Sequence, residues 1–179
     1  LVFGLGGLPW AVLLLGFFIT SSGFSRLFKR RKAGLSEKHA KGSRRDWAQV
    51  FANGGLGMLL VLAHWLFPEQ TWPWMAFAGA MAAVNADTWA TELGVLSPAA
   101  PRLITSGRTV EMGTSGGVTL VGSLASLAGA ALIGLLAALF PGGAAGLSII
   151  PAAALGGLAG SLFDSLLGAT LQAIYICPV

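Results

Sequence analysis

Hydrophobic and polar positions follow one another along this chain in long blocks. Three apolar blocks, at residues 3–22, 47–68 and 72–95, are each about as long as the roughly 20 residues that cross a bilayer as a helix. Between them lie the basic stretch SRLFKRRKAGLSEKHAKGSRRD and the short turn FPEQTWP, which holds two prolines. Each block is therefore predicted to form a membrane-spanning helix.

The second half of the chain predicts two further spans. No charged residue occurs in the 52 positions from 112 to 163. One helix of that length would extend about 78 Å, far more than the thickness of a bilayer. The sequence PGG at 141–143 is the natural break, so spans are placed at 116–139 and 146–173.

The resulting fold class is all-α, a polytopic transmembrane helix bundle of about five spans that forms a single membrane domain over residues 1–179. The composition agrees, because 55% of the residues are hydrophobic and only 10% are charged, whereas globular domains have about 25% charged residues. The single cysteine, Cys177, excludes a disulfide framework. Because the chain opens with Leu1 and stops just after an apolar stretch, we expect it to be cut at both ends.

The basic residues predict the topology. Nine of the eleven Lys and Arg fall in the linker 25–46, and the other two, Arg102 and Arg108, fall in the loop 96–114. A basic run can indicate nucleic acid, but between apolar spans it more often fixes orientation, so no nucleic-acid partner is expected. Both segments are predicted to be cytoplasmic, in a multi-pass protein of the bacterial inner membrane whose site faces the cytoplasm.

Three acids interrupt the predicted spans: Asp87 and Glu92 in the third and Asp164 in the fifth. A carboxylate inside a membrane is costly unless it faces the protein interior or a water-filled cavity. Asp87 and Asp164 lie at a similar depth, roughly 12–14 Å from the cytoplasmic end of their spans. Polar neighbours at helical spacing share these faces: Asn53 in the second span, Asn85 and Thr88 in the third, and Ser165 in the fifth. We therefore expect one polar site in the cytoplasmic half.

The chemistry of that site is predicted from its residue types. Three carboxylates suit Mg²⁺, so Asp87, Glu92 and Asp164 are predicted as metal ligands and catalytic residues. Arg102 and Arg108 suit bidentate contacts with phosphate. The sequence GTSGG at 113–117 is expected to open the fourth span and to bind phosphate at a helix N-terminus. The hydroxyls of the fourth span, Thr119, Ser123 and Ser126, are interpreted as helix-packing groups.

Long motifs carry a family resemblance. NADTWATELGVLS, PRLITSGRTVEMGTSGGVTLVGSLASLAGA and GSLFDSLLGATLQ resemble the integral membrane family that includes plant phytyl-phosphate kinase and the animal transmembrane-protein-nineteen group. The resemblance implies a polytopic kinase that uses a nucleoside triphosphate, preferably CTP, to convert a prenyl or phytyl monophosphate to the diphosphate. The positions that match the family motifs, and to which we assign catalytic or phosphate-binding roles, are Asn53, Asn85, Asp87, Thr88, Glu92, Arg102, Thr105, Ser106, Arg108, Thr114, Ser115, Gly116, Gly117, Asp164 and Ser165.

Two alternatives stay open at this point. A cytidylyltransferase that forms a CDP-lipid would use the same metal and nucleotide contacts but would release pyrophosphate. A transporter of anions or lipids could also carry intramembrane acids. The one internal similarity in the sequence is between Asp-Thr at 87–88 and Asp-Ser at 164–165. It falls on spans that run in the same direction, so it is no inverted repeat of the kind common in carriers.

Overall fold

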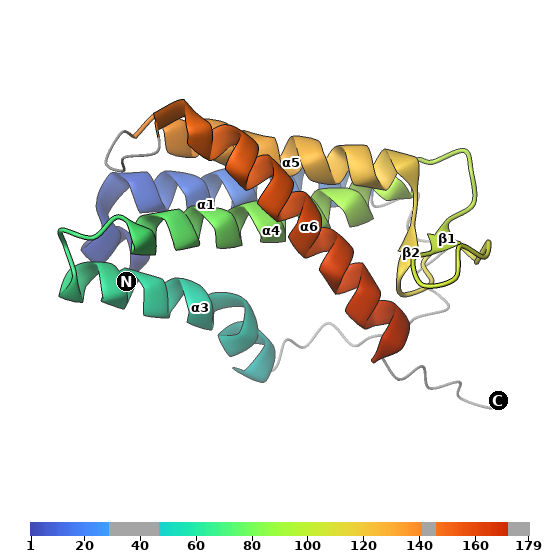
Figure 1. Ribbon diagram of the computed structural model, residues 1–179, viewed down its shortest axis with the longest axis horizontal. Helices are drawn as coiled ribbons and strands as arrows, with labels where there is room; N and C mark the ends of the chain where they lie inside the picture. The colour runs from blue at the N-terminus through green and yellow to red at the C-terminus, as the bar shows by residue number, and fades with distance from the viewer. Residues whose placement is uncertain (29–46, 141–145, 172–179) are drawn as a thin grey trace.

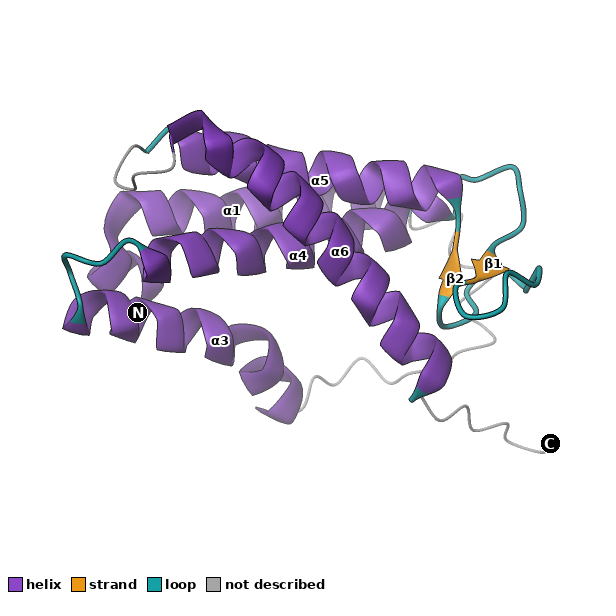
Figure 2. Ribbon diagram, in the orientation of Figure 1, coloured by secondary structure: helices purple, strands orange, loops and turns teal. Residues whose placement is uncertain are grey.

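The computed structural model describes residues 1–28, 47–140 and 146–171, which form a bundle of five α-helices with one small sheet (Figures 1 and 2). In chain order the elements are α1 (Val2–Leu27), α3 (Trp47–Leu66), α4 (Trp72–Gly94), β1 (Arg102–Leu103), β2 (Gly117–Val118), α5 (Leu120–Ala138), the 3₁₀ turn η1 (Gly146–Ser148) and α6 (Ile149–Thr170). The predicted all-α bundle is thus confirmed. The linker from residue 29 to 46 and the PGG break lie outside the described residues.

Three helices are long and apolar enough to cross a membrane by length and composition, namely α1, α5 and the segment Gly146–Thr170. Helix α4 has 23 residues, but its composition includes Asp87 and Glu92. Helix α3 has 20 residues, and its described part from Gly54 to Leu66 is apolar but shorter than a span. These helices make the chain a multi-pass membrane protein.

Helix α4 occupies the middle of the bundle, where small residues let its neighbours approach closely. A Cβ placed on Gly129 of α5 would lie 2.9 Å from the Trp89 ring of α4. A Cβ placed on Gly157 of α6 would lie 3.0 Å from the carbonyl oxygen of Ala82. Glycines at such contacts are the usual device by which helices pack inside a membrane, where apolar burial alone gives little driving force.

The apolar core fills the end of the bundle that is remote from the sheet. Trp10 and Leu13 of α1 pack there with Phe77 of α4 and Ile133 of α5, and all four are nearly or completely inaccessible. The rings of Trp10 and Phe77 have centroids 4.5 Å apart and are tilted by 37° to each other, within the range of contacts that aromatic pairs make. This end of the bundle is consequently closed.

The segment after α4 differs from the prediction. Strands β1 and β2 pair antiparallel, with Leu103 opposite Gly117, and α5 begins only at Leu120, where the Thr119 hydroxyl accepts a hydrogen bond from the Gly122 amide at 3.0 Å. The prediction that residues 113–117 open the fourth span is therefore wrong. Gly113 and Gly116 adopt φ of 88° and 76°, left-handed conformations that end regular structure and that only glycine adopts at low cost.

Candidate functional site

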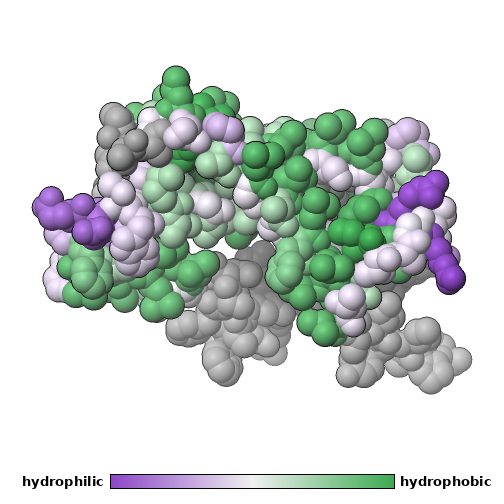
Figure 3. All heavy atoms as spheres, viewed as in Figure 1, coloured by the Kyte–Doolittle hydropathy of each residue, from purple (hydrophilic) through white to green (hydrophobic). Residues whose placement is uncertain are grey.

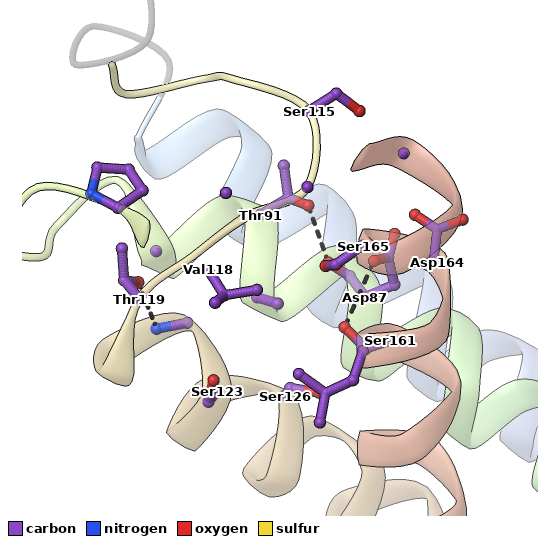
Figure 4. A pocket seen from close by; sticks show the side chains of 18 of the residues that line it. Asp87, Thr91, Ser115, Val118, Thr119, Ser123, Ser126, Ser161, Asp164 and Ser165 are labelled. Carbon is purple, nitrogen blue, oxygen red and sulfur yellow. Dashed lines mark hydrogen bonds between the residues drawn. The ribbon is translucent and has the colours of Figure 1, made fainter. Parts of the chain in front are cut away.

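A cavity of about 730 Å³ opens at the sheet end of the bundle, between α4, α5 and α6 and beneath the loop that leads into β2 (Figure 4). Its polar lining comes from all four of these segments: Asp87 and Thr91 of α4, Ser123 and Ser126 of α5, Ser161, Asp164 and Ser165 of α6, and Thr114 and Ser115 of the loop. Such a concentration of oxygen atoms inside a membrane protein is costly unless it meets a polar ligand or water.

Two carboxylates dominate this lining. Asp87 projects from α4 and Asp164 from α6, and Figure 4 shows them close together on one side of the cavity. The Ser161 hydroxyl donates a hydrogen bond to Asp87 Oδ1 at 3.4 Å, and the Thr91 hydroxyl donates to the backbone oxygen of Asp87 at 3.0 Å. The first of these bonds joins α4 to α6, and the second lies within α4.

The deep wall of the cavity carries hydroxyl groups that the sequence analysis left out of the site. Ser161 is 4% exposed and Ser126 only 1%. The Ser126 hydroxyl has no hydrogen-bond partner among the described residues, although buried polar atoms in proteins nearly always have one. Ser126 therefore belongs to the cavity lining, and the interpretation of its hydroxyl as a packing group needs correction. Spacing in the sequence could have found Ser161 and the neighbouring lining residue Thr91, because Ser161 precedes Asp164 by three positions and Thr91 follows Asp87 by four.

Below this wall the cavity is closed. Ala82 of α4 and Ala130 of α5 have no exposed surface, and Gly157 of α6 packs against both of them. The cavity thus ends inside the bundle instead of continuing to the far side.

The loop above the cavity rests on the last turns of α6. A Cβ placed on Gly116 would lie 2.8 Å from the backbone nitrogen of Ala169, and a Cβ placed on Gly168 would lie 3.3 Å from the Gly116 nitrogen. Four predicted phosphate-binding residues, Thr114, Ser115, Gly116 and Gly117, do line the cavity. They do so as consecutive turns and the start of β2, not as the first turn of a helix.

Helix α4 separates Glu92 from the aspartates. Glu92 is 7% exposed and accepts a hydrogen bond from the Ser25 hydroxyl of α1 at 2.8 Å. It follows Asp87 by five residues, which turns its side chain about 140° away around the helix. The predicted three-acid metal site is therefore not assembled, and no group of three His, Cys, Asp or Glu side chains gathers within the described ranges.

Asn85 is also outside the cavity. Its side chain is fully buried, donates to the Gly129 carbonyl of α5 at 2.7 Å, and accepts from the Thr20 hydroxyl of α1 at 3.2 Å. Asn85 precedes Asp87 by two residues, so it points to the opposite side of α4. The phosphate-binding role predicted for Asn85 is not supported, because the side chain holds three helices together.

Apart from Asn53, the remaining predicted residues lie away from the cavity lining. The Thr88 hydroxyl bonds to the Val84 carbonyl of its own helix. The Arg102 guanidinium donates to the Gly107 carbonyl at 3.1 Å. Four of these residues are exposed on the hairpin that β1 begins: Arg102, Thr105, Ser106 and Arg108. The structure therefore does not bring these side chains to the two aspartates. Asn53 falls in the part of α3 whose side chains are outside the described residues.

Comparisons with known proteins agree on the class of protein. The family described as integral membrane protein DUF92 matches residues 1–179. Protein PGR of Arabidopsis thaliana is 40% identical over 195 aligned residues, which cover 97% of this chain and 68% of that protein. An uncharacterized membrane protein of Methanocaldococcus jannaschii is 39% identical over 170 residues, which cover 93% of this chain and 66% of that protein.

A further relative extends the set to cyanobacteria. An uncharacterized membrane protein of Synechocystis is 28% identical over 179 residues, which cover 94% of this chain and 68% of that protein. The chain thus spans about two thirds of the length of these relatives. No solved structure matches it.

Proposed function

The chain belongs to the DUF92 family of integral membrane proteins, and from that premise we propose that it is a membrane-embedded lipid-phosphate kinase. In this reaction an oxygen of a prenyl monophosphate attacks the γ-phosphorus of a nucleoside triphosphate, with CTP as the expected donor. The bond from the γ-phosphorus to the bridging oxygen breaks, and a nucleoside diphosphate leaves with a lipid diphosphate as the other product. The observation that carries the proposal is the pair Asp87 and Asp164 in one cavity under the loop.

The donor set of the cavity fits Mg²⁺. This ion prefers oxygen ligands and is usually bound by one or two carboxylates together with substrate phosphates. Asp87 and Asp164 supply the carboxylates, and no Lys or Arg of the described segments forms an ion pair with either of them. These two residues would hold the ion, and when bound it would neutralise charge on the transferred phosphoryl group.

The loop above the cavity supports a role for the donor's polyphosphate. Its backbone packs against Gly168 and Ala169 of α6, at the end of the bundle where Arg102 and Arg108 are exposed. We place the polyphosphate between the loop and the aspartates, and the two arginines at the mouth, where they would attract an anionic donor. In this proposal the sheet end faces the cytoplasm, because nucleoside triphosphates are supplied from that side.

The closed end of the cavity agrees with a reaction that is carried out from one face of the membrane. The packing of Gly157, Ala82 and Ala130 ends the cavity inside the bundle. A site open toward one face is what a reaction between a lipid and a water-soluble donor requires.

A phosphate-transfer assay tests the proposal. Purified protein in detergent receives Mg²⁺, γ-labelled CTP or ATP, and phytyl or geranylgeranyl monophosphate. We expect label in a lipid diphosphate, and a loss of at least about 100-fold in Asp87→Asn and Asp164→Asn, because each change removes a carboxylate from the transition-state surroundings. Glu69→Gln is the matched control, since Glu69 is an exposed acid at the opposite end of the bundle.

The products decide between the alternatives. Label in the lipid diphosphate that disappears with Asp87→Asn but persists with Glu69→Gln supports the kinase. Release of labelled pyrophosphate together with a CDP-lipid would show that the protein is a cytidylyltransferase and not a kinase. An Asp87→Asn variant that is as active as the parent protein would overturn the site assignment.

A further inference from the structure

Along the axis of the bundle the cavity is closed at the end remote from the sheet and covered in part by a loop at the sheet end. Below, Gly157 packs against Ala82 and Ala130. Above, the loop around Gly116 is seated on Ala169 of α6. The open part of the sheet end is the place we assign to the nucleotide, so a lipid whose hydrocarbon chain stays in the bilayer would reach the aspartates from the side, between helices.

The cavity itself lies between α5 and α6 at the sheet end, since residues of both helices line it. These helices are held together near the turn that joins them, where a Cβ on Gly134 would lie 2.9 Å from the Cα of Ile150 and 3.0 Å from the Cβ of Ala153. Toward the sheet end the two helices diverge (Figure 1). There Gly122 of α5 contacts α4 instead, at Ala90 and Gly94.

The lining of this divergent region changes from apolar to polar. Leu158 and Leu162 of α6, one turn apart and both half-buried, line the cavity opposite Ser126. On the outer surface of the same helix Leu155 is 65% exposed and Phe163 is 59% exposed, as expected of a surface that faces lipid. Figure 3 shows hydrophobic side chains over this part of the molecule. A molecule that lies with its chain among the leucines would bring a polar head to the hydroxyls and carboxylates.

We propose that the acceptor enters the cavity sideways from the bilayer between α5 and α6. Its hydrocarbon chain lies against Leu158 and Leu162, and its phosphate is directed toward Asp87 and Ser126. This inference rests on the proposed function, since it assigns the route and the chain-binding surface to the acceptor of that reaction. The occupant is a single-chain amphiphile with a terminal phosphate, the prenyl monophosphate of the proposed reaction, whose polar head would meet the serines and carboxylates of the lining.

Paired acceptors test the route. Leu158→Trp and Leu162→Trp narrow it, whereas Leu155→Trp and Phe163→Trp add similar bulk on the outer surface of the same helix. With geranylgeranyl monophosphate we expect kcat/KM to fall about tenfold or more in the first pair and to stay within about threefold in the second pair. With water-soluble isopentenyl monophosphate the loss in the first pair should be at least about threefold smaller than with geranylgeranyl monophosphate, because the short chain makes less use of the route. Equal losses with both acceptors, or no loss with either, would overturn the route.

A second measurement does not depend on turnover. A long-chain alkyl phosphate with a diazirine in its chain is photolysed with the parent protein in detergent, and the labelled peptides are mapped by mass spectrometry. Labelling on α5 and α6 that geranylgeranyl monophosphate competes away supports the route even if no phosphate is transferred, in which case only the kinase fails. Labelling confined to α1 or α3 overturns the route even if transfer occurs, in which case the kinase stands.

Discussion

At the scale of single residues, the angular position of a side chain around α4 decides its role. Asp87 and Thr91, four positions apart, face the cavity. Asn85 and Glu92 face α1, where they bond to Thr20 and Ser25. Residues two and five positions apart are rotated by about 200° and 140° in a helix. The polar side chains of this helix therefore form two groups, one that surrounds the cavity and one that joins α4 to α1.

The second group predicts a separation between stability and activity. Asn85→Ala removes bonds to Gly129 and Thr20, so we expect the free energy of unfolding to fall by about 1–2 kcal/mol, the range for polar contacts between membrane helices. Thermal unfolding in detergent measures this change, and phosphate transfer per folded molecule should stay within about threefold. An Asn85→Ala protein with the parent's melting temperature and no phosphate transfer would instead indicate that Asn85 binds phosphate.

The sequence predicted the aspartates but not how the acids are divided. Asp87 and Asp164 stood out because carboxylates are rare in apolar spans, and both line the cavity. Glu92 stood out for the same reason, yet its environment depends on which face of α4 meets α1. That face is fixed by contacts between segments far apart in the chain, such as the bond between Ser25 and Glu92, and these leave no spacing signal within one span.

At the scale of elements, glycines set how closely α6 approaches its neighbours. Gly156 and Gly157 are adjacent in α6, but a Cβ on Gly156 would have no atom within 4 Å, whereas one on Gly157 would lie 3.0 Å from the Ala82 oxygen. The apolar pattern predicted this helix as a span over 146–173. It could not distinguish the two glycines, because both sit in an uninterrupted run of small and apolar residues.

This difference gives a prediction with an adjacent control. Gly157→Ala overpacks the contact with α4 and should lower the free energy of unfolding by about 1–3 kcal/mol. Gly156→Ala should be neutral or stabilising by up to about 1 kcal/mol, since alanine is the better helix former. Both are measured by thermal unfolding in detergent. Equal effects of the two changes would contradict the close approach of α6 to α4.

The loop above the cavity allows a similar comparison. Gly107 and Gly116 both have positive φ, 67° and 76°, so alanine at either position costs roughly 1–2 kcal/mol of backbone strain. A Cβ would meet Ala169 only at Gly116 and would have open space at Gly107. We expect Gly116→Ala to displace the loop from α6 and to lower kcat/KM for the nucleotide about tenfold or more.

The Gly107→Ala protein serves as the control for that strain and should retain nucleotide kcat/KM within about threefold. Similar kcat/KM values for the two variants would show that the contact of the loop with α6 does not affect use of the nucleotide.

The pairing of β1 with β2 that shapes this loop was absent from the prediction. Strands of two residues, such as Arg102–Leu103 and Gly117–Val118, are too short to produce an alternating pattern.

At the scale of the whole molecule, the two ends of the bundle differ in chemistry. One end holds the aromatic and aliphatic core around Trp10 and Phe77. The other holds the cavity and the hairpin that exposes Arg102 and Arg108. This polarity was predictable, because long apolar blocks and the placement of Lys and Arg are properties of the sequence alone. The neighbours of each helix were not, since every span offers a similar apolar surface.

The polarity predicts on which side of the membrane each end lies. Ser106 is exposed on the hairpin at the sheet end, and Glu69 is exposed in the turn between α3 and α4 at the other end. Cys177 is the single cysteine of the chain, so Cys177→Ser gives a background in which Ser106→Cys or Glu69→Cys is the sole thiol. In right-side-out vesicles a membrane-impermeant maleimide should label only the position-69 variant, and in inside-out vesicles only the position-106 variant.

Labelling of both from one side would contradict the arrangement of the spans. The reverse pattern would place the cavity mouth away from the cytoplasm, where a nucleoside triphosphate could not supply the reaction, and would count against the kinase itself.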